Sequence, residues 1–334
     1  MDYTFQTDDS NSSKKIWIGV FAFVVTATIV LILIVRAADK RDDKLIDEDT
    51  AADKIEEVGK EVDDNKGASQ EEVKSVAPPP AVLSSDQLKP ASDAVRDLIA
   101  KGQDAERRDD LTAARAAYEE ALASKDCGDA QTLIENRLGD VFIKLITSQR
   151  QMAEKIDHAI VSGDLLEKLA RKYGTTSELI AKANGISNPN AIKIGDRLRI
   201  LNKPNFEITV SKSQNWLLVT MNGKFFKRYT VGTGRYNRTP VGTFKIDDKI
   251  VEPSWWTDGR EIPYGDKENI LGTRWMRIAA TGNTPPANGY GIHGTWDTTS
   301  LGQQSSAGCV RMANPDVEEL YTYIPKGTSV TIIE

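Results

Sequence analysis

The sequence predicts a multidomain α+β chain in which helical segments precede a mainly β domain. Three observations lead to this fold class. Residues 16–35 are twenty residues without a charge, long enough to cross a bilayer as a helix. Apolar residues recur with helical spacing between residues 92 and 151, whereas from Phe206 onward they alternate with polar residues as in strands. A length of 334 residues has room for several such units.

The N-terminus predicts a membrane anchor. Residues 1–15 are polar and read as a cytoplasmic tail, followed by a transmembrane helix at 16–35. A cleavable signal peptide is the alternative, but its apolar core is normally shorter, and residues 35–37 form a poor cleavage site. We therefore expect the helix to be retained. Basic residues flank both of its ends and do not settle its orientation.

The next segment, residues 36–90, predicts a flexible acidic linker. Residues 37–90 contain 15 acidic and 8 basic side chains and few aromatic ones, so they bury too little apolar surface to offset the entropy of ordering. By contrast, residues 205–334 contain 14 basic and 13 acidic side chains and are nearly neutral. No basic face for nucleic acid is expected anywhere in the chain.

Residues 91–151 predict a small helical segment. Gly102, Ala114, Tyr118 and Ala121 have the small-and-aromatic spacing that resembles one tetratricopeptide repeat. A single repeat cannot build a solenoid or a long groove. We interpret the segment as a helical spacer, with docking of a partner protein as the functional alternative.

Residues 156–202 predict a strand–helix–helix–strand module. A short strand at 159–161 is followed by a turn at Gly163, a helix, a second helix at 177–183 and a closing strand at 197–201. The order and residues resemble a LysM domain, a module that binds N-acetylglucosamine glycans. The resemblance places the glycan along two loops, with contacts at Gly163, Asp164, Leu165, Leu166, Asn188 and Ile192. His158 is interpreted as a polar strand-edge residue without a partner.

Residues 205–334 predict the mainly β domain. Asn222-Gly223 between two apolar runs predicts a hairpin with a type I′ turn, because both central residues must adopt positive φ. Further strands are expected at 243–246 and 330–333. The one convincing helix follows Asn314, which we expect to cap it, with Pro315 in the first turn.

A Cys–His pair within this domain predicts the chemistry. The chain has only two cysteines and two histidines, and Cys309 and His293 both fall in one glycine-rich stretch. A thiol is mostly protonated at neutral pH, so thiolate catalysis requires a neighbouring base. Gly294 and Gly308 would leave backbone uncovered for a substrate carbonyl and an oxyanion. Because the two Cys and two His are scattered, neither a metal cluster nor a cofactor is expected.

The residues around Cys309 and His293 make the prediction of a catalytic Cys–His pair specific. His293-Gly-Thr followed by Ser306-Ala-Gly-Cys-Val-Arg-Met312 resembles the active-site signature of the YkuD-type L,D-transpeptidases, which cross-link bacterial peptidoglycan. Many members have His where this chain has Ala307. The resemblance covers about residues 206–334 and includes Thr239-Pro-Val-Gly-Thr-Phe244 and Leu271-Gly-Thr-Arg-Trp275.

The resemblance implies a role for each site residue. Cys309 would be the nucleophile and His293 its base, resting either as thiol and imidazole or as thiolate and imidazolium. The expected oxyanion and substrate support is Gly308, Ser306, Arg311, Gly294 and Thr295, and the expected substrate wall is Trp255, Trp256, Tyr264 and Tyr290. Arg311 could equally form an internal ion pair, and the aromatic residues could equally be ordinary core.

The implied activity is acyl transfer through a Cys thioester, from a tetrapeptide stem of peptidoglycan to an amine acceptor. An L,D-carboxypeptidase or amidase would use the same two residues, and an inactive wall-binding tether is the alternative outside enzymes. Because the implied substrate lies outside the cell membrane, we expect a single-pass protein whose catalytic domain is periplasmic or extracytoplasmic.

Overall fold

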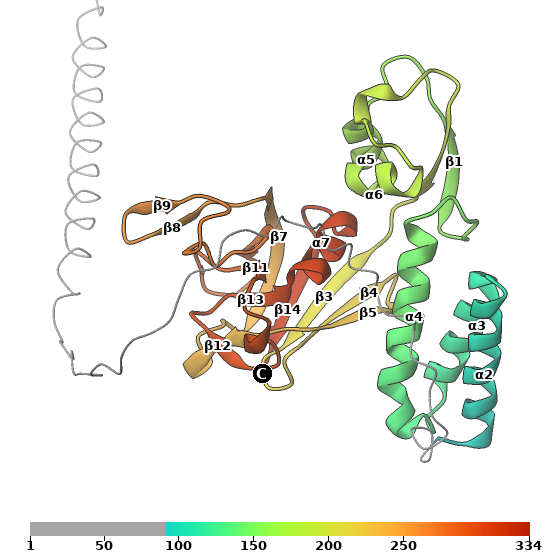
Figure 1. Cartoon of the computed structure of the whole chain (residues 1–334), viewed down its shortest axis with the longest axis horizontal. Helices are drawn as coiled ribbons and strands as arrows, with labels where there is room; N and C mark the ends of the chain where they lie inside the picture. The colour runs from blue at the N-terminus through green and yellow to red at the C-terminus, as the bar shows by residue number, and fades with distance from the viewer. Residues whose placement is uncertain (1–90) are drawn as a thin grey trace, which may run out of the picture. The chain divides into compact units, whose positions relative to one another are not determined.

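The computed structural model describes residues 91–334, shown in colour in Figure 1. The predicted tail at 1–15, the transmembrane helix at 16–35 and the linker at 36–90 lie outside these residues. Within residues 91–334, none of the helices combines the length and the apolar character that crossing a membrane would require.

The helical segment consists of three helices, α2 (Asp93–Arg107), α3 (Leu111–Ala123) and α4 (Gln131–Ile146), with a short 3₁₀ turn, η2 (Gly128–Ala130), before the last. Side chains of Ser92 and Asp110 accept hydrogen bonds from the first turns of α2 and α3 and so cap them. A Cβ atom on Gly102 would lie 2.4 Å from the Tyr118 ring, so only glycine allows α2 and α3 to approach this closely.

The LysM-like module folds around an apolar core of its own. Its elements are β1 (Lys155–Ala159), α5 (Leu166–Tyr173), α6 (Ser177–Ala183), η3 (Pro189–Ala191) and β2 (Arg197–Leu201). The first strand had been expected at 159–161 but begins at Lys155, because antiparallel pairing with β2 runs from Lys155–Leu201 to Ala159–Arg197. Gly174, at φ +59°, ends α5 in the left-handed conformation.

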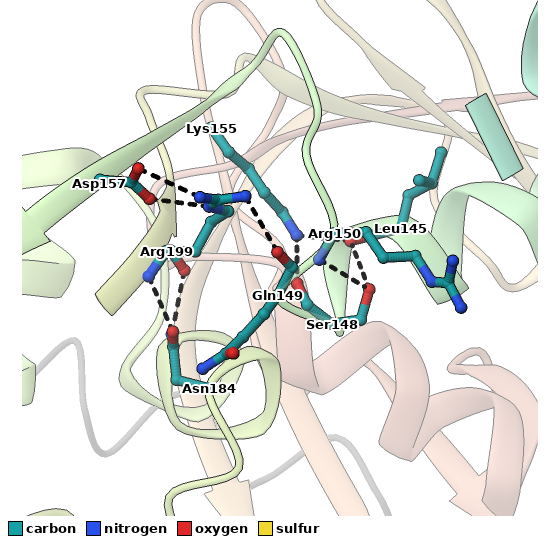
Figure 2. Close-up of polar contacts among 8 residues, drawn as sticks. All are labelled: Leu145, Ser148, Gln149, Arg150, Lys155, Asp157, Asn184 and Arg199. Carbon is teal, nitrogen blue, oxygen red and sulfur yellow. Dashed lines mark hydrogen bonds and ion pairs between the residues drawn. The ribbon is translucent and has the colours of Figure 1, made fainter. Parts of the chain in front are cut away.

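Polar contacts join this module to the helical segment (Figure 2). The Lys155 ammonium donates to the carbonyl oxygens of Leu145 and Ser148 at the C-terminal end of α4. The Arg199 guanidinium donates to the Asp157 carboxylate at 2.8 and 3.1 Å and to the Gln149 carbonyl at 3.1 Å. Two basic side chains therefore satisfy free carbonyl groups where the helix ends.

The C-terminal domain is built on one eight-stranded sheet with the order β13-β11-β10-β7-β14-β3-β4-β5. The β11–β13 and β14–β3 pairs are parallel, and the other pairs are antiparallel. The strands are β3 (Phe206–Ser211), β4 (Trp216–Met221), β5 (Lys224–Thr230), β7 (Gly242–Val251), β10 (Arg274–Ala280), β11 (Gly291–Thr295), β13 (Val310–Ala313) and β14 (Ser329–Ile333).

Two small two-stranded sheets complete the domain. One pairs β6 (Thr233–Gly234) with β12 (Gln304–Ser306), and the other pairs β8 (Trp255–Thr257) with β9 (Arg260–Ile262). Short 3₁₀ turns, η4 (Arg235–Asn237) and η5 (Thr298–Ser300), lie in the loops. The prediction of a mainly β domain with one late helix, α7 (Asn314–Tyr323), is confirmed.

Local details agree with the sequence in one place and differ in another. Asn222 and Gly223 have φ values of +54° and +75°, as a type I′ hairpin between β4 and β5 requires. Asn314, however, is the first residue of α7 and not its cap. Its side-chain oxygen accepts the Thr273 N–H at 3.1 Å, so this residue joins the helix to the loop before β10.

The helical segment is not a separate spacer, as the sequence had suggested, because it shares one hydrophobic core with the C-terminal domain. Phe142 of α4 lies against Phe226 of β5, with ring centroids 5.0 Å apart. Glu135 is only 4% exposed and pairs with Arg228 at 2.6 Å. Helix α4 thus covers β5, the last strand of the sheet, which would otherwise be an open edge.

Candidate active site

Cys309 and His293 lie on neighbouring parallel strands and line the same cavity. His293 belongs to β11, and Cys309 immediately precedes β13, which pairs with β11 so that His293 is opposite Arg311. The cavity has a volume of about 570 Å³, and its wall includes both side chains together with Trp275 and Arg311. The parallel register of two strands therefore brings together residues that are sixteen positions apart.

His293 is buried, with 2% of its surface exposed. Its Nδ1 lies 2.6 Å from the Gly294 carbonyl oxygen, and because a carbonyl only accepts, Nδ1 carries the proton in this arrangement. Burial lowers the pKa of His293 to about 4, and the charge of Arg311 adds to this effect, while hydrogen bonds with the backbone of Gly294 and Leu271 oppose it. The imidazole is consequently neutral at pH 7.

The thiol of Cys309 responds to burial in the opposite direction. Burial raises the pKa of Cys309 above its ordinary value, although a backbone hydrogen bond from Gly291 and the charge of Arg311 partly counteract this. Its Sγ lies 3.6 Å from the Gly289 carbonyl. Of the two resting states considered, these directions favour neutral thiol with neutral imidazole over an ion pair.

Ser306 organises the loop that carries the nucleophile. Its hydroxyl donates to the Cys309 carbonyl at 2.7 Å and accepts the Gly308 N–H at 3.1 Å. Gly308 has φ +144°, and a Cβ there would lie 2.6 Å from the Tyr290 ring, so glycine is required on both counts. Since the Gly308 N–H is engaged, an oxyanion at this turn is left with the Cys309 N–H as the donor.

The other residues expected to support the site divide into two groups. Arg311 lines the cavity, forms no ion pair with any residue between 91 and 334, and its buried Nε lacks a hydrogen-bond partner in that range. The internal ion pair, one of the two alternatives for Arg311, is thus not formed in that range, although the lowered pKa of Asp297 reflects a hydrogen bond from Thr299 and, to a smaller extent, the charge of Arg311. Gly294 and Thr295 do not line the cavity. A Cβ on Gly294 would lie 2.1 Å from the Asn314 side chain, so this glycine makes room for α7 and not for substrate.

The expected aromatic wall is present in part. Trp255, Trp256 and Tyr290 line the cavity, and 67% of Trp256 is exposed. Tyr264 does not line it and instead lies near Trp296, with ring centroids 6.4 Å apart. The short β8–β9 hairpin carries both tryptophans of the wall.

Sequence reasoning assigned no role to Trp275, which lines the cavity, or to Asn269, which lies behind its wall. Trp275 pairs with His293 across β10 and β11, and its ring lies 5.7 Å from the imidazole. Asn269 is buried beneath the hairpin and donates to the carbonyls of Pro253 and Ile262, while accepting the Leu271 N–H at 2.9 Å. Trp275 ends the Leu271–Trp275 motif and Asn269 lies two residues before it, but only strand register and loop contacts show their roles.

Only some of the predicted glycan-binding residues of the LysM-like module line a cavity. Asn188 and Ile192 line a cavity of about 360 Å³, whereas Gly163, Asp164, Leu165 and Leu166 do not. Leu166 is 1% exposed and belongs to the core, so it is not a surface contact, while Leu165 is half exposed.

His158 of this module is not a partnerless edge residue, as had been predicted. Its Nε2 lies 2.8 Å from the Asp164 carboxylate, and its Nδ1 lies 3.0 Å from the Tyr173 hydroxyl. The Val161 N–H and His158 together hold the pKa of Asp164 below its usual value.

The functional groups that line the cavity suit acyl transfer to a thiol and do not suit the binding of a metal ion. A neutral imidazole and a thiol line one pocket, and the N–H of Cys309 has no protein acceptor in the described part of the chain. Among residues 91–334, no group of three or more His, Cys, Asp or Glu side chains could hold a metal ion. The fold and site therefore fit an enzyme of the acyl-transfer class.

Comparison with known proteins gives the family. A family model for the L,D-transpeptidase catalytic domain matches residues 205–332, and one for the LysM domain matches residues 158–201. The chain is 37% identical over 128 residues to the putative L,D-transpeptidase YqjB of Bacillus subtilis, covering 38% of this chain and 70% of that protein. It is 28% identical over 183 residues to the putative L,D-transpeptidase YkuD of the same organism, covering 53% and 98% respectively.

The chain belongs to the L,D-transpeptidase family. It is an enzyme, a peptidoglycan L,D-transpeptidase, and its LysM and catalytic domains bind peptidoglycan. The resemblances to an L,D-transpeptidase domain and to a LysM domain are thereby confirmed, while the resemblance of residues 91–151 to a tetratricopeptide repeat stays a prediction.

Proposed function

We propose that Cys309 is the nucleophile of this transpeptidase and His293 its general base. The single observation that supports the proposal most is that a buried, neutral imidazole and a thiol line one cavity beside an unused Cys309 N–H. His293 takes the thiol proton as Sγ attacks the carbonyl carbon of the third residue of a tetrapeptide stem. A C–S bond forms, and the carbonyl electron pair moves onto oxygen.

Collapse of this intermediate breaks the C–N bond to the terminal D-Ala. The imidazolium returns its proton to the departing amine, which leaves a thioester on Cys309. An amine of a second stem then attacks the thioester, His293 accepts the amine proton, and the sulfur leaves as the thiol. Trp255, Trp256 and Tyr290 restrict the cavity and thereby limit competition by water.

Arg311 serves as an anion contact in this proposal. Its guanidinium lines the cavity without an ion-pair partner among residues 91–334. A stem peptide brings free carboxylates, which a guanidinium binds well. Gly294, Thr295 and Ser306 act indirectly in this proposal. They shape the strand that carries His293 and the loop that carries Cys309.

Incubating residues 91–334 with purified disaccharide tetrapeptides, followed by mass spectrometry, tests the reaction. Cross-linked dimers with loss of one D-Ala are expected. Trimmed tripeptides without dimers would instead show that water resolves the thioester, as in an L,D-carboxypeptidase. Cys309→Ala should form neither product, and retention of cross-linking in that variant would exclude Cys309 as the nucleophile.

The proposal places the enzyme at the outer side of the cytoplasmic membrane. The twenty uncharged residues at 16–35 support a retained anchor, the acidic linker at 36–90 supports a tether, and the LysM domain supports retention near glycan strands. Intact mass of the protein from membranes tests the anchor, since a signal peptide would be missing from the mature chain. Docking of a partner protein on α2 and α3 stays a prediction.

A further inference from the structure

Thr239 is buried beside the nucleophile loop and joins two backbone segments through its hydroxyl. It is 1% exposed, and its Oγ1 accepts the Gly234 N–H at 2.7 Å while donating to the Gly308 carbonyl at 2.8 Å. The direction of both bonds is unambiguous, because an N–H only donates and a carbonyl only accepts. Residue 308 immediately precedes the proposed nucleophile.

The position of one carbonyl determines the direction of the next N–H. In a planar trans peptide the C=O and the following N–H point in opposite directions, and residues 91–334 contain no cis peptide. When Thr239 holds the Gly308 carbonyl on the protein side, the Cys309 N–H must point the other way. Among residues 91–334, no protein acceptor takes this N–H.

Gly308 makes such a constraint necessary. Its φ of +144° lies in a region that glycine enters easily, so the Gly308–Cys309 peptide would be free to rotate if nothing held it. Thr239 suits this task because its side chain is β-branched and its backbone precedes Pro240, both of which restrict rotation. Gly234 contributes by its small size, since a Cβ there would lie 2.9 Å from the Gly308 Cα.

We propose that Thr239 is a positioning residue for the oxyanion: its hydroxyl holds the Gly308–Cys309 peptide so that the Cys309 N–H faces the reacting carbonyl oxygen. The inference rests on the proposed acyl transfer at Cys309. As Sγ bonds to the carbonyl carbon, the negative charge moves to oxygen and the Cys309 N–H donates to it. Thr239 touches neither the sulfur nor the substrate.

Two reactions of the same sulfur separate this role from a general structural one. Acylation of Cys309 by a carbapenem would open the lactam carbonyl and pass through an oxyanion, whereas iodoacetamide alkylates a thiol by displacement of iodide and forms none. In Thr239→Val, carbapenem acylation measured by intact mass should slow by about 10- to 100-fold, somewhat less than complete loss of an oxyanion donor. Alkylation of Cys309 should keep the wild-type rate.

Two further variants serve as controls. Thr239→Ser keeps the hydroxyl and should recover most of the acylation rate. Thr233→Val makes the same change at a fully buried threonine of the adjoining strand β6, whose hydroxyl donates to Asn215 at 3.3 Å and not to the nucleophile loop. It should acylate like the wild type. If Thr239→Val does not fold, Thr239→Ala replaces it in the same comparison.

The outcomes decide between distinct explanations. Slower acylation with unchanged alkylation, restored by Ser, supports the proposal. Equal loss of both reactions would show that Thr239 acts on the thiol and not on the oxyanion, and unchanged acylation would show that the peptide needs no such restraint. Either result overturns the inference. If the wild type itself is not acylated at Cys309, the failure lies with the proposed function and not with Thr239.

Discussion

The shared core of the helical segment and the catalytic domain predicts that a helix residue controls the stability of the enzyme. Phe142 of α4 is 1% exposed, lies 5.0 Å from the Phe226 ring, and is covered on its other side by the Arg115 guanidinium at 4.6 Å. Replacing a fully buried Phe by Ala typically costs about 3–5 kcal/mol. In a cooperative unit of this size, 1 kcal/mol corresponds to roughly 2–4 °C in Tm.

We therefore expect Phe142→Ala to lower the Tm of the catalytic domain by about 10 °C. Tryptophan fluorescence of residues 91–334 measures this directly, because every tryptophan in that range lies at or beyond Trp216, in the catalytic domain. The matched control is Leu169→Ala in the LysM core, which is equally buried but belongs to a separate cluster. It should leave the fluorescence transition unchanged.

An unshifted fluorescence transition in Phe142→Ala would refute the reasoning, particularly if helical circular dichroism were lost at a lower temperature. The helices would then be an independent unit that rests on the sheet. The same argument predicts that a fragment beginning at residue 158 is unsuitable for assays, because it would expose the side chains of β5 that α4 covers.

Four further results are expected. Iodoacetamide should modify Cys309 in the native protein and should not modify Cys127, which is 6% exposed, until the protein unfolds. Peptide mass mapping measures the labelling of each thiol. Equal labelling of both thiols in the native protein would contradict the structure. Because burial raises the pKa of Cys309 and lowers that of His293 to about 4, alkylation should accelerate as the pH rises above the ordinary thiol pKa, and a rate that stays high down to pH 5 would show an ion pair instead. The pKa of His293 is about 4 in the folded protein and about 6.5 in the unfolded chain, so the buried neutral imidazole adds to the free energy of unfolding above pH 6.5. This contribution is lost as the pH falls toward about 4. Urea titrations of wild type and His293→Gln at several pH values measure it. Finally, Asn269→Ala should raise KM for the stem and lower stability by about 1–3 kcal/mol, since it leaves buried backbone groups unpaired. Asn288→Ala, a change at an asparagine that does line the cavity, controls for altered lining. Equal KM values in wild type and Asn269→Ala would show that the hairpin holds its position without this residue.

The residues alone determined those features that depend on short stretches of chain. The Asn222-Gly223 turn needs two neighbouring residues with positive φ. The helices of the LysM module follow from apolar spacing, with a side-chain cap at Thr176 for α6 and a left-handed Gly174 at the end of α5. The family could be recognised because the residues around His293 and Cys309 form a characteristic sequence motif.

Only the tertiary structure shows which segments that are distant in the sequence pack together or form hydrogen bonds. Phe142 and Phe226 are 84 positions apart, so no local pattern shows that α4 closes the sheet and that the helices belong to the enzyme's core. Likewise, the sequence indicated that N–H groups near Gly308 and Cys309 would stabilise an oxyanion, but only the structure shows that Ser306 accepts the Gly308 N–H and that Thr239, from a separate loop, binds the Gly308 carbonyl. Hydrogen-bond directions and side-chain packing depend on which strands become neighbours, and that is settled only when the whole sheet assembles.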